Sequence, residues 1–401
     1  MVDPFWPVFS SFVDRKSSQR IADEFVRVPE LFHASWVAQS IVPAQEKLIL
    51  VTGSKGKGTV ARQIAWNLQA QGLRVGLVLS PEEKTHLDRI RLNDQAIDLA
   101  SFESYLQQIL PDLKARLSHE PPQKYLSPTG IFLTVALHYF AQTKPDWIVI
   151  EGGRGVVWDE IGQLRARIGI ITTLLPEHLT ELGGNFEAVF QDKMRLSSQV
   201  QECFLGPQAL LAIAPYPSLQ KAYETTPSIR KSLSHPSQPK LDKDDLAKNY
   251  PTWFAQLSQL SQQVLHTLHP NSVYRSYPTT SFGCIQTTHG QLWFEPVVHH
   301  LSLDPSFIQA HIAPSSCIVM GLTPDKDGIS IEQTLRQLGF KEFFFFNISW
   351  QPSSDERTID VVNPHTDLLR STLSQLVEQH KTVYAIGIQT FIRSIRLAFK
   401  L

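Results

Sequence analysis

The chain has 401 residues, which is too long for one ordinary hydrophobic core and predicts two or three domains. With 42% hydrophobic and 10% aromatic residues, its composition is that of a folded globular protein. The 37 Lys and Arg residues balance 38 Asp and Glu residues, which gives a net charge of −1. This balance argues against a nucleic-acid partner or a polybasic membrane binder, because both need a large basic excess. It leaves room for a local basic pocket that binds a phosphate.

Cysteine usage and the apolar runs favour a cytoplasmic protein without a membrane partner. The cysteines are too few and too scattered for a disulfide framework or a thiolate metal site. Residues 1–10 have no basic stretch followed by a long apolar run, as a signal peptide would. The most apolar local run, residues 343–346, is far shorter than the roughly 20 residues that span a bilayer. The cysteines are Cys203, Cys284 and Cys317.

The first two thirds of the chain predict strands that alternate with helices. Apolar runs throughout the strands are typical of a parallel sheet covered on both faces. Residues 1–45 are predicted to be helical. A helix is expected from Thr59 to a C-terminal glycine at position 72, and another is expected to be interrupted or kinked at Pro111. The predicted strands are 48–51, 75–79, 147–150 and 168–172, and the other predicted helices are 102–117 and 131–140.

A second α/β unit is predicted after about residue 270. The proline-rich stretch 215–240 indicates an irregular excursion, and a helix is expected over 253–268. The alternation of strands and helices then resumes, so we expect domains over residues 1–270 and 271–401. The predicted strands of the smaller domain are 317–320, 343–348, 359–362 and 383–386, and its predicted helices are 331–338, 368–379 and 391–399.

The strongest local signal is the sequence Gly-Ser-Lys-Gly-Lys-Gly-Thr at positions 53–59, between a predicted strand and a predicted helix. Glycines let several backbone N–H groups face one anion, and the helix N-terminus adds positive potential. Lys57 can reach terminal phosphates, and Thr59 can offer a hydroxyl to magnesium. The alternative is a surface turn with solvated lysines, but the flanking elements favour nucleotide binding by Gly53, Ser54, Lys55, Gly56, Lys57, Gly58 and Thr59.

Further candidate side chains follow downstream. Glu151 comes directly after a predicted strand, where ligands bind in parallel sheets, and a carboxylate there suits magnesium. The alternative is a helix-capping or exposed acid. His178 follows the next strand and is either a structural histidine or a ligand at the same sheet edge. Lys193, taken alone, is typical of a solvated helix lysine.

These residues resemble the folylpolyglutamate synthase and dihydrofolate synthase family, a branch of the Mur ligase superfamily. The family's loop, Gly-Thr-Asn-Gly-Lys-Gly-Ser, has the spacing of residues 53–59, including the extra glycine after the lysine. Residues 80–81 and 88–93 (Ser-Pro and Asp-Arg-Ile-Arg-Leu-Asn) are similar to the family's Ser-Pro-His-Leu and Glu-Arg-Ile-Arg-Ile-Asn segments. Residues 325–327 resemble an Asp-Lys-Asp stretch of the family's C-terminal domain, which implies nucleotide contacts for Asp325 and Lys326.

The resemblance implies an ATP-dependent ligase that joins a small carboxylate to an amine of the amino-acid type through an acyl phosphate. It implies ATP and Mg²⁺, an expected monomer, a P-loop-containing parallel-sheet α/β ATPase domain with an N-terminal helical segment, and a smaller Rossmann-like α/β C-terminal domain. Glu151, His178 and Lys193 fall on the family's metal-binding glutamate, its ligand histidine and its carbamylated lysine. The implied catalytic residues are Lys57, His178 and Lys193, and the implied metal ligands are Thr59, Glu151, His178 and Lys193.

Two segments depart from the family pattern. In the stretch that begins with Glu151, Asp159 keeps its register, but Val157 stands at the family's arginine position. The C-terminal motif Asp-Gly-Ala-His-Asn has no clean counterpart, because Val-Val-His-His occupies residues 297–300. Three hypotheses follow: an amide ligase with another carboxylate and amine, a divergent folylpolyglutamate or dihydrofolate synthase, and a non-catalytic nucleotide-binding homologue. A kinase would need an acceptor hydroxyl and a base near the loop, and the sequence identifies neither.

Overall fold

The chain forms two compact units, which are described separately. In the computed structural model, one unit is formed by Met1–Pro239 with Gln256–Tyr277, and the other by Lys240–Ala255 with Pro278–Leu401. The predicted domain limits, 1–270 and 271–401, stay predictions. The structure describes residues 26–82, 85–121, 124–177, 179, 182, 184–230, 251–270, 274–275, 282–297, 299–323, 326–347, 358–360 and 366–400.

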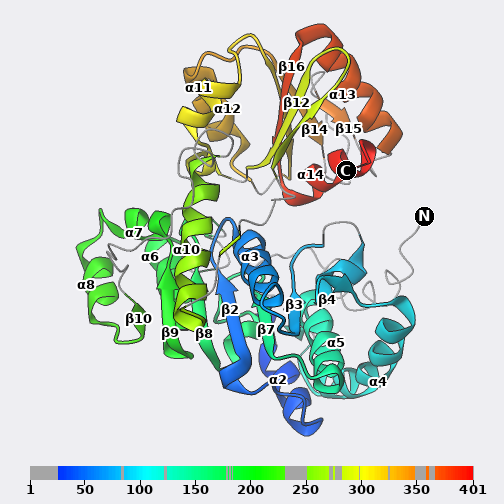
Figure 1. Cartoon of the computed structure of the whole chain (residues 1–401), viewed down its shortest axis with the longest axis vertical. Helices are drawn as coiled ribbons and strands as arrows, with labels where there is room; N and C mark the ends of the chain where they lie inside the picture. Colours follow the sequence, from blue (N-terminus) through cyan, green and yellow to red (C-terminus); the bar gives the residue numbers. More distant parts are fainter. Residues whose placement is uncertain are drawn as a thin grey trace. The chain divides into compact units, whose positions relative to one another are not determined.

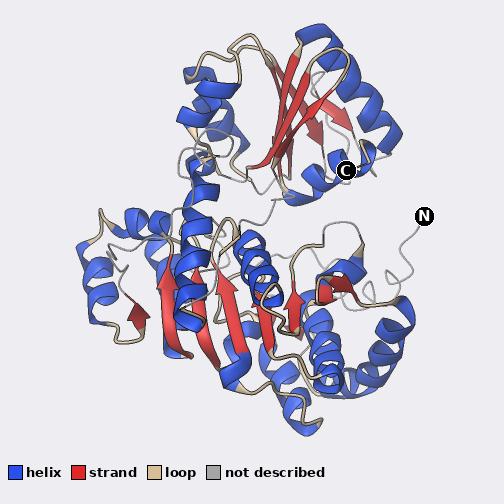
Figure 2. Cartoon of the chain, viewed as in Figure 1, coloured by secondary structure: helices blue, strands red, loops and turns tan. Residues whose placement is uncertain are grey.

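The first unit is built on a sheet whose described strands have the order β10-β9-β8-β2-β7-β3-β4-β5. The strands from β10 to β3 run parallel, while β4 and β5 are antiparallel additions at one edge (Figure 2). The central strands β2 and β7 are buried along their whole length, as helices on both faces require. The bounds are β2 Leu48–Thr52, β3 Val75–Val78, β4 Ile90–Leu92, β5 Gln95–Ala96, β7 Trp147–Glu151, β8 Ala166–Ile171, β9 Val200–Leu205 and β10 Ile229–Arg230, with β1 Val26–Arg27 and β6 Lys124–Tyr125 forming a separate parallel pair.

The helices of this unit begin at local capping signals. Asp98 accepts a hydrogen bond from the Ser101 N–H at 2.8 Å and starts α4, and Ser127 accepts one from the Gly130 N–H at 2.9 Å and starts α5. Helices α3 and α10 lie side by side (Figure 1), because Gln63 donates a hydrogen bond to Ser258 Oγ at 2.8 Å. The bounds are α2 Pro29–Ala38, α3 Lys57–Gln69, α4 Leu99–Ser118, α5 Pro128–Thr143, α6 Phe186–Met194, α7 Pro207–Ile213 and α8 Pro217–Thr225, with 3₁₀ turns η1 Gln45–Lys47, η2 His86–Arg89, η3 Glu160–Gln163 and η4 Arg195–Ser198. Helix α10 spans Thr252–Leu268 and belongs to this unit from Gln256 onward.

Two expectations from the sequence need correction. The predicted irregular excursion over 215–240 is wrong in its first part, because α8 occupies Pro217–Thr225. Pro217 stands in the first turn of that helix, where a missing N–H costs no hydrogen bond. Helix α4 also runs through Pro111, so the interruption predicted there is wrong, while the kink predicted as its alternative stays a prediction. Residues 1–25 of the predicted N-terminal helical segment and residues 231–250 lie outside the described part of the chain.

The second unit is a smaller α/β layer structure with the strand order β11-β12-β16-β13-β14-β15. All its described strand pairs are parallel except β11 with β12. Alternate residues of β13 belong to two different apolar clusters: Cys317 and Val319 to one, Ile318 and Met320 to the other. The sheet is therefore covered on both faces. The bounds are β11 Gly283–Gln286, β12 Gln291–Pro296, η5 His300–Ser302, α11 Pro305–His311, β13 Cys317–Leu322, α12 Gly328–Gln337, β14 Phe343–Asn347, β15 Thr358–Asp360, α13 Thr366–His380, β16 Thr382–Gly387 and α14 Gln389–Ala398.

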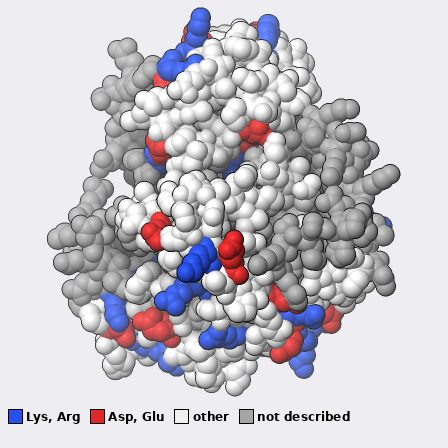
Figure 3. Space-filling view, turned by 90° about the vertical axis from the view of Figure 1, so that its left-hand side faces the viewer, with Lys and Arg blue, Asp and Glu red and all other residues white. Residues whose placement is uncertain are grey.

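The surface agrees with the balanced charge of the sequence. Acidic and basic side chains lie interspersed on the face drawn in Figure 3. Among the described helices, none combines the length and the apolar character that crossing a membrane requires.

Candidate functional site

The loop between β2 and α3 has a backbone that only glycine adopts readily at two positions. Gly53 has φ +135° and Gly56 has φ +81°, both in the left-handed half of the map. A Cβ atom on Gly53 would collide with Thr172 Oγ1, and one on Gly56 would collide with the Leu257 side chain. The glycines at these positions are thus required by backbone geometry and by close packing, as a loop that curls around an anion requires.

Hydrogen bonds fix this loop to the segment that leaves β8. The N–H groups of Ser54 and Lys55 donate to the Thr173 carbonyl at 3.0 Å and to Thr173 Oγ1 at 2.6 Å. Thr172 Oγ1 donates to the Lys55 carbonyl at 2.7 Å. The first hydrogen bond of α3 runs from the Val60 N–H to the Gly56 carbonyl at 3.0 Å. The N–H groups at positions 57–59 precede it and have no acceptor within the helix, so the helix N-terminus can offer them to a phosphate.

The carboxylate of Glu151 lies against the first turn of α3. Glu151 ends β7 and pairs in register with Val51 of β2, which leads into the loop. Its Oε2 accepts a hydrogen bond from the Ser80 N–H at 2.9 Å, and a Cβ atom on Gly58 would lie 3.1 Å from that oxygen. The extra glycine after Lys57 therefore makes room for the carboxylate. Burial raises the pKa of Glu151 to about 7, although the positive charge of Lys57 acts in the opposite direction.

Lys193 is buried, and so its description as a solvated helix lysine is wrong. Its side chain on α6 is 2% exposed, and its Nζ lies 3.6 Å from Glu177 Oε1. Burial lowers the pKa of Lys193 to about 8; the Glu177 carboxylate opposes this shift, while the charge of Lys57 adds to it. Lys57 thus acts electrostatically on both Glu151 and Lys193, and these three residues are called the charged cluster below.

The remaining predicted site residues lie in different parts of the chain. Thr59 lies in the first turn of α3 and is half-buried. Lys326 belongs to the second unit, where its N–H donates to the Thr323 carbonyl at 3.0 Å. His178 and Asp325 lie outside the described residues. The roles predicted for all these residues remain predictions.

Sequence reasoning missed the carboxylates that shape the loop after Glu151. Asp159 Oδ2 accepts hydrogen bonds from the N–H groups of Gly153 and Arg154, both at 3.0 Å. Asp192 accepts them from Val156 at 2.7 Å and Val157 at 3.0 Å. The register of Asp159 with the family pattern was a usable signal, whereas Asp192 is marked only by its position next to Lys193.

Buried ion pairs with Arg27 also hold this loop in place. Arg27 pairs with Glu160 and, at 3.5 Å, with Asp159 Oδ2. Glu160 also accepts a hydrogen bond from Ser127 Oγ at 2.7 Å. Both carboxylates are 1% exposed, and burial of a carboxylate is costly without ion-pair or hydrogen-bond partners such as these. The first departure from the family pattern, in the loop after Glu151, is therefore held by buried contacts.

Comparison with known proteins finds a family match within the first unit. Residues 51–206 match the family model described as the Mur ligase middle domain. This range contains the loop after β2, Glu151 and Lys193, and thus the whole cluster described above.

The curated proteins that the chain is similar to are folylpolyglutamate and dihydrofolate synthases. The chain is 29% identical over 167 residues to the folylpolyglutamate synthase of Lacticaseibacillus casei, which covers 42% of this chain and 38% of that protein. It is 28% identical over 186 residues to the dihydrofolate synthase/folylpolyglutamate synthase of Bacillus subtilis, with coverage of 43% and 42%. The matches therefore span less than half the length of these relatives.

Solved structures show the fold of the whole chain. The Mycobacterium tuberculosis folylpolyglutamate synthase complexed with ADP and AMPPCP has a TM-score of 0.72 at 14% identity, over 98% of this chain and 99% of that one. The Yersinia pestis bifunctional folylpolyglutamate synthase/dihydrofolate synthase, complexed with AMPPNP and a Mn ion, gives 0.70 at 16%, over 98% of both chains. The predicted fold is confirmed. The predicted resemblance is also confirmed: residues 51–206 match the Mur ligase middle domain, and the chain is similar to folylpolyglutamate and dihydrofolate synthases in sequence and in fold.

Proposed function

We propose that this chain is an ATP-dependent ligase that forms a C–N bond between a carboxylate and an amine of the amino-acid type. The observation that carries this proposal is the cluster of Lys57, Glu151 and the buried Lys193 beside a glycine loop at the carboxyl edge of the sheet. The match to the Mur ligase middle domain and the branch of the relatives support it.

The residues present fit ATP and a divalent metal ion. The loop provides a cradle that a Cβ at Gly53 or Gly56 would fill, and the carboxylate of Glu151 is an oxygen donor of the kind that Mg²⁺ prefers. We assign the metal to Thr59, Glu151, His178 and Lys193, where it would neutralise phosphate charge. Lys193 fits this role only after carbamylation, because its amine must first become an oxygen ligand.

In the proposed reaction, the substrate carboxylate attacks the γ-phosphate of ATP and forms an acyl phosphate. The amine then attacks the acyl carbon, and the tetrahedral intermediate collapses to the amide and phosphate, with ADP released. Lys57 neutralises the transferred phosphoryl group, and the N–H groups at positions 57–59 orient it. The burial of Glu151 and Lys193 strengthens these electrostatic effects, because the local dielectric is lower than that of water.

The proposed substrate is a carboxylate other than a folate. The loop after Glu151 supports this choice, because Val157 replaces the arginine of the family pattern and the loop is held in its own conformation by Asp159 and Asp192. A divergent folylpolyglutamate or dihydrofolate synthase is the second candidate, favoured by the relatives.

The test measures ADP and phosphate release by the full chain with paired carboxylate and amine substrates, with folates plus glutamate as one arm. The proposal expects release only when both an acid and an amine are present. It also expects loss of release in Lys57→Ala but not in Lys47→Ala, which removes an exposed lysine before β2. Phosphate release without any acceptor would instead identify a simple nucleoside triphosphatase. Nucleotide binding without turnover across the panel would establish a non-catalytic homologue.

We further propose that the protein works in the cytoplasm as a monomer. The three cysteines are free thiols, and the described structure buries Cys203 and Cys317. Light scattering during gel filtration tests the assembly state: a mass near 45.3 kDa is expected, and twice that mass would contradict the proposal.

A further inference from the structure

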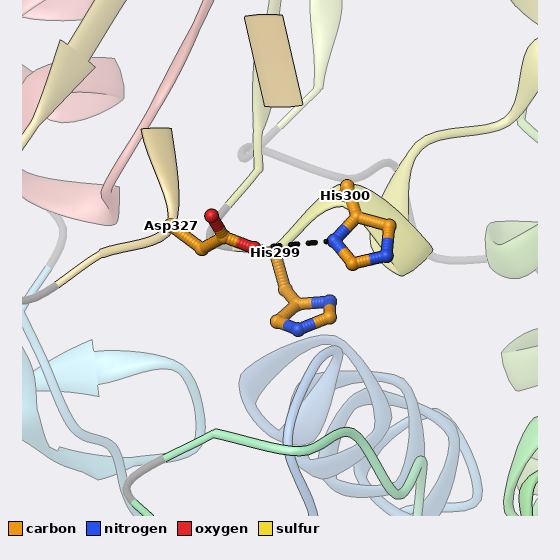
Figure 4. Close-up of side chains that lie close together, drawn as sticks. All are labelled: His299, His300 and Asp327. Atoms are coloured by element: carbon orange, nitrogen blue, oxygen red, sulfur yellow. Dashed lines mark hydrogen bonds and ion pairs between the residues drawn. The ribbon is translucent and has the colours of Figure 1, made fainter. Parts of the chain in front are cut away.

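The second unit contains a cluster of metal-ligand side chains that the proposed ligase reaction does not use. It comprises His299, His300 and Asp327, which come from two segments: the turn before and within η5, and the residue that caps α12. Each residue offers one ligand atom, and these atoms all lie within 4.8 Å of one another. Figure 4 shows the carboxylate of Asp327 facing the ring of His300.

The distance between the Asp327 and His300 side chains is close to the distance between two atoms that bind the same metal ion. Asp327 Oδ2 lies 3.3 Å from His300 Nδ1. Zinc bonds of about 2.0–2.1 Å at tetrahedral angles place neighbouring ligand atoms about 3.3 Å apart. The pair therefore has the spacing of two neighbouring ligand atoms.

The turn at the start of η5 places the rings of His299 and His300 on the same side of the backbone. Consecutive side chains of an extended strand point in opposite directions, but here η5 begins directly after His299, and the two rings stack with centroids 4.4 Å apart. The turn therefore brings ring nitrogens of both histidines near the Asp327 carboxylate.

The Asp327 carboxylate is held in place by the helix that it caps. Asp327 Oδ1 accepts the Ser330 N–H at 3.1 Å as the N-cap of α12, which leaves Oδ2 directed at His300. The helix cap therefore orients the carboxylate in the way that second-shell contacts orient metal ligands.

We propose that His299, His300 and Asp327 bind a first-row divalent transition metal ion, for which Zn²⁺ is the reference. Two imidazoles and one carboxylate form a ligand set that zinc uses in sites with a remaining open position. Binding replaces the hydrogen bond from the Leu301 N–H to His299 Nδ1 at 3.2 Å, because that nitrogen becomes either coordinated or protonated when the ring takes a metal. The half-buried His300 and Asp327 leave the site accessible to an ion, with exposed fractions of 33% and 37%.

The test uses the full chain, stripped with a chelator and kept in excess Mg²⁺ to occupy magnesium sites. Zn²⁺ is titrated by calorimetry, and Co²⁺ by its visible absorption, which reports tetrahedral coordination. We expect one Zn²⁺ per chain that is lost in His300→Ala and weakened about tenfold or more in Asp327→Asn. Asn keeps the helix cap, so this variant separates ligand loss from unfolding of α12. His289→Ala removes an exposed histidine of the same unit and is the matched control.

The result has two clear outcomes. Zinc should raise the melting temperature of the wild-type chain and of His289→Ala, and should have no such effect on His300→Ala. Equal zinc stoichiometry and affinity in all variants would overturn the proposal and leave a simple hydrogen bond between His300 and Asp327. Neither readout depends on ligase turnover, so failure here leaves the proposed function untouched.

Discussion

Asp192 accepts the Val156 N–H at 2.7 Å and thereby links helix α6 to the loop that follows Glu151. The neighbouring residue on α6 is Lys193, whose side chain turns toward Glu177. One turn of helix therefore positions both the altered loop and the buried lysine. A change in the loop is thus coupled structurally to the charged cluster.

Substitution of Asp192 by Asn should destabilise the protein. The amide keeps one acceptor oxygen but turns an NH₂ group toward a backbone N–H, which leaves a buried donor unpaired. We expect a loss of about 1–3 kcal/mol in the free energy of unfolding, measured in urea. Asp112→Asn is the control, because its ion pair with Arg116 is 34% exposed on the aspartate side and should contribute less than about 1 kcal/mol. Equal losses in both variants would contradict this role of Asp192.

Gly56 and Gly72 allow a matched test of the phosphate loop. They have nearly the same φ, +81° and +83°, but a Cβ on Gly72 meets nothing within 4 Å, whereas one on Gly56 strikes Leu257. Gly72→Ala should cost about 1 kcal/mol from backbone strain alone. Gly56→Ala should cost about 1–3 kcal/mol more through overpacking.

Nucleotide affinity separates these two variants further. Calorimetric titration with ATP and Mg²⁺ should show weaker binding in Gly56→Ala and unchanged binding in Gly72→Ala. The expectation is wrong if both alanine variants bind the nucleotide as well as the wild-type chain does.

The contact between Lys193 and Glu177 should appear as a coupling free energy. Lys193→Met keeps the length of the side chain in the core, and Glu177→Gln keeps the shape of the acid. Because both side chains are at most 10% exposed, solvent screens their interaction weakly. A double-mutant cycle in urea should give a favourable coupling of about 0.5–3 kcal/mol. Strictly additive effects would show that the two charges do not interact in solution.

Glu82 should make stability depend on pH in the acid range. Burial would raise the pKa of its carboxyl group, but the close contact with His86, whose Nδ1 lies 3.5 Å from Glu82 Oε2, and the charge of Arg89 hold that pKa well below its usual range. A carboxyl group with a lowered pKa in the folded state stabilises the protein above its unfolded value, about 4.3, and loses this effect as the pH falls through the interval below.

We therefore expect Glu82→Gln to cost about 2 kcal/mol at pH 7, because it removes a charged hydrogen-bond partner from Arg89. The difference from the wild-type chain should shrink as the pH falls below about 4. Urea unfolding at pH 7 and at a pH below about 4 measures this difference in the free energy of unfolding. The variant Glu103→Gln, at an exposed residue, is the control. A difference that is the same at both pH values would rule out the ionised Glu82 as its source.

Many of the regular elements follow from the sequence pattern. The buried strands β2 and β7 were predicted from continuous apolar runs, and α3 from the apolar spacing that starts at Thr59. The antiparallel strands β4 and β5 were missed, because they are short and lie at an edge where burial does not impose a pattern. Helix α8 is not predicted, because the many prolines between residues 215 and 240 indicate irregular structure. Pro217 nevertheless begins the helix.

The sequence by itself indicated the proposed nucleotide loop, because the glycines at positions 53 and 56 near Lys57 suit the left-handed backbone angles found there beside a helix N-terminus. Only the tertiary structure decided which charges meet there. The burial of Lys193, its contact with Glu177 and the hold of Asp192 on the loop after Glu151 depend on segments far apart in the chain. Such contacts cannot be predicted from the local sequence. A lysine has the same sequence neighbours whether the folded chain exposes it to water or brings it to a distant carboxylate.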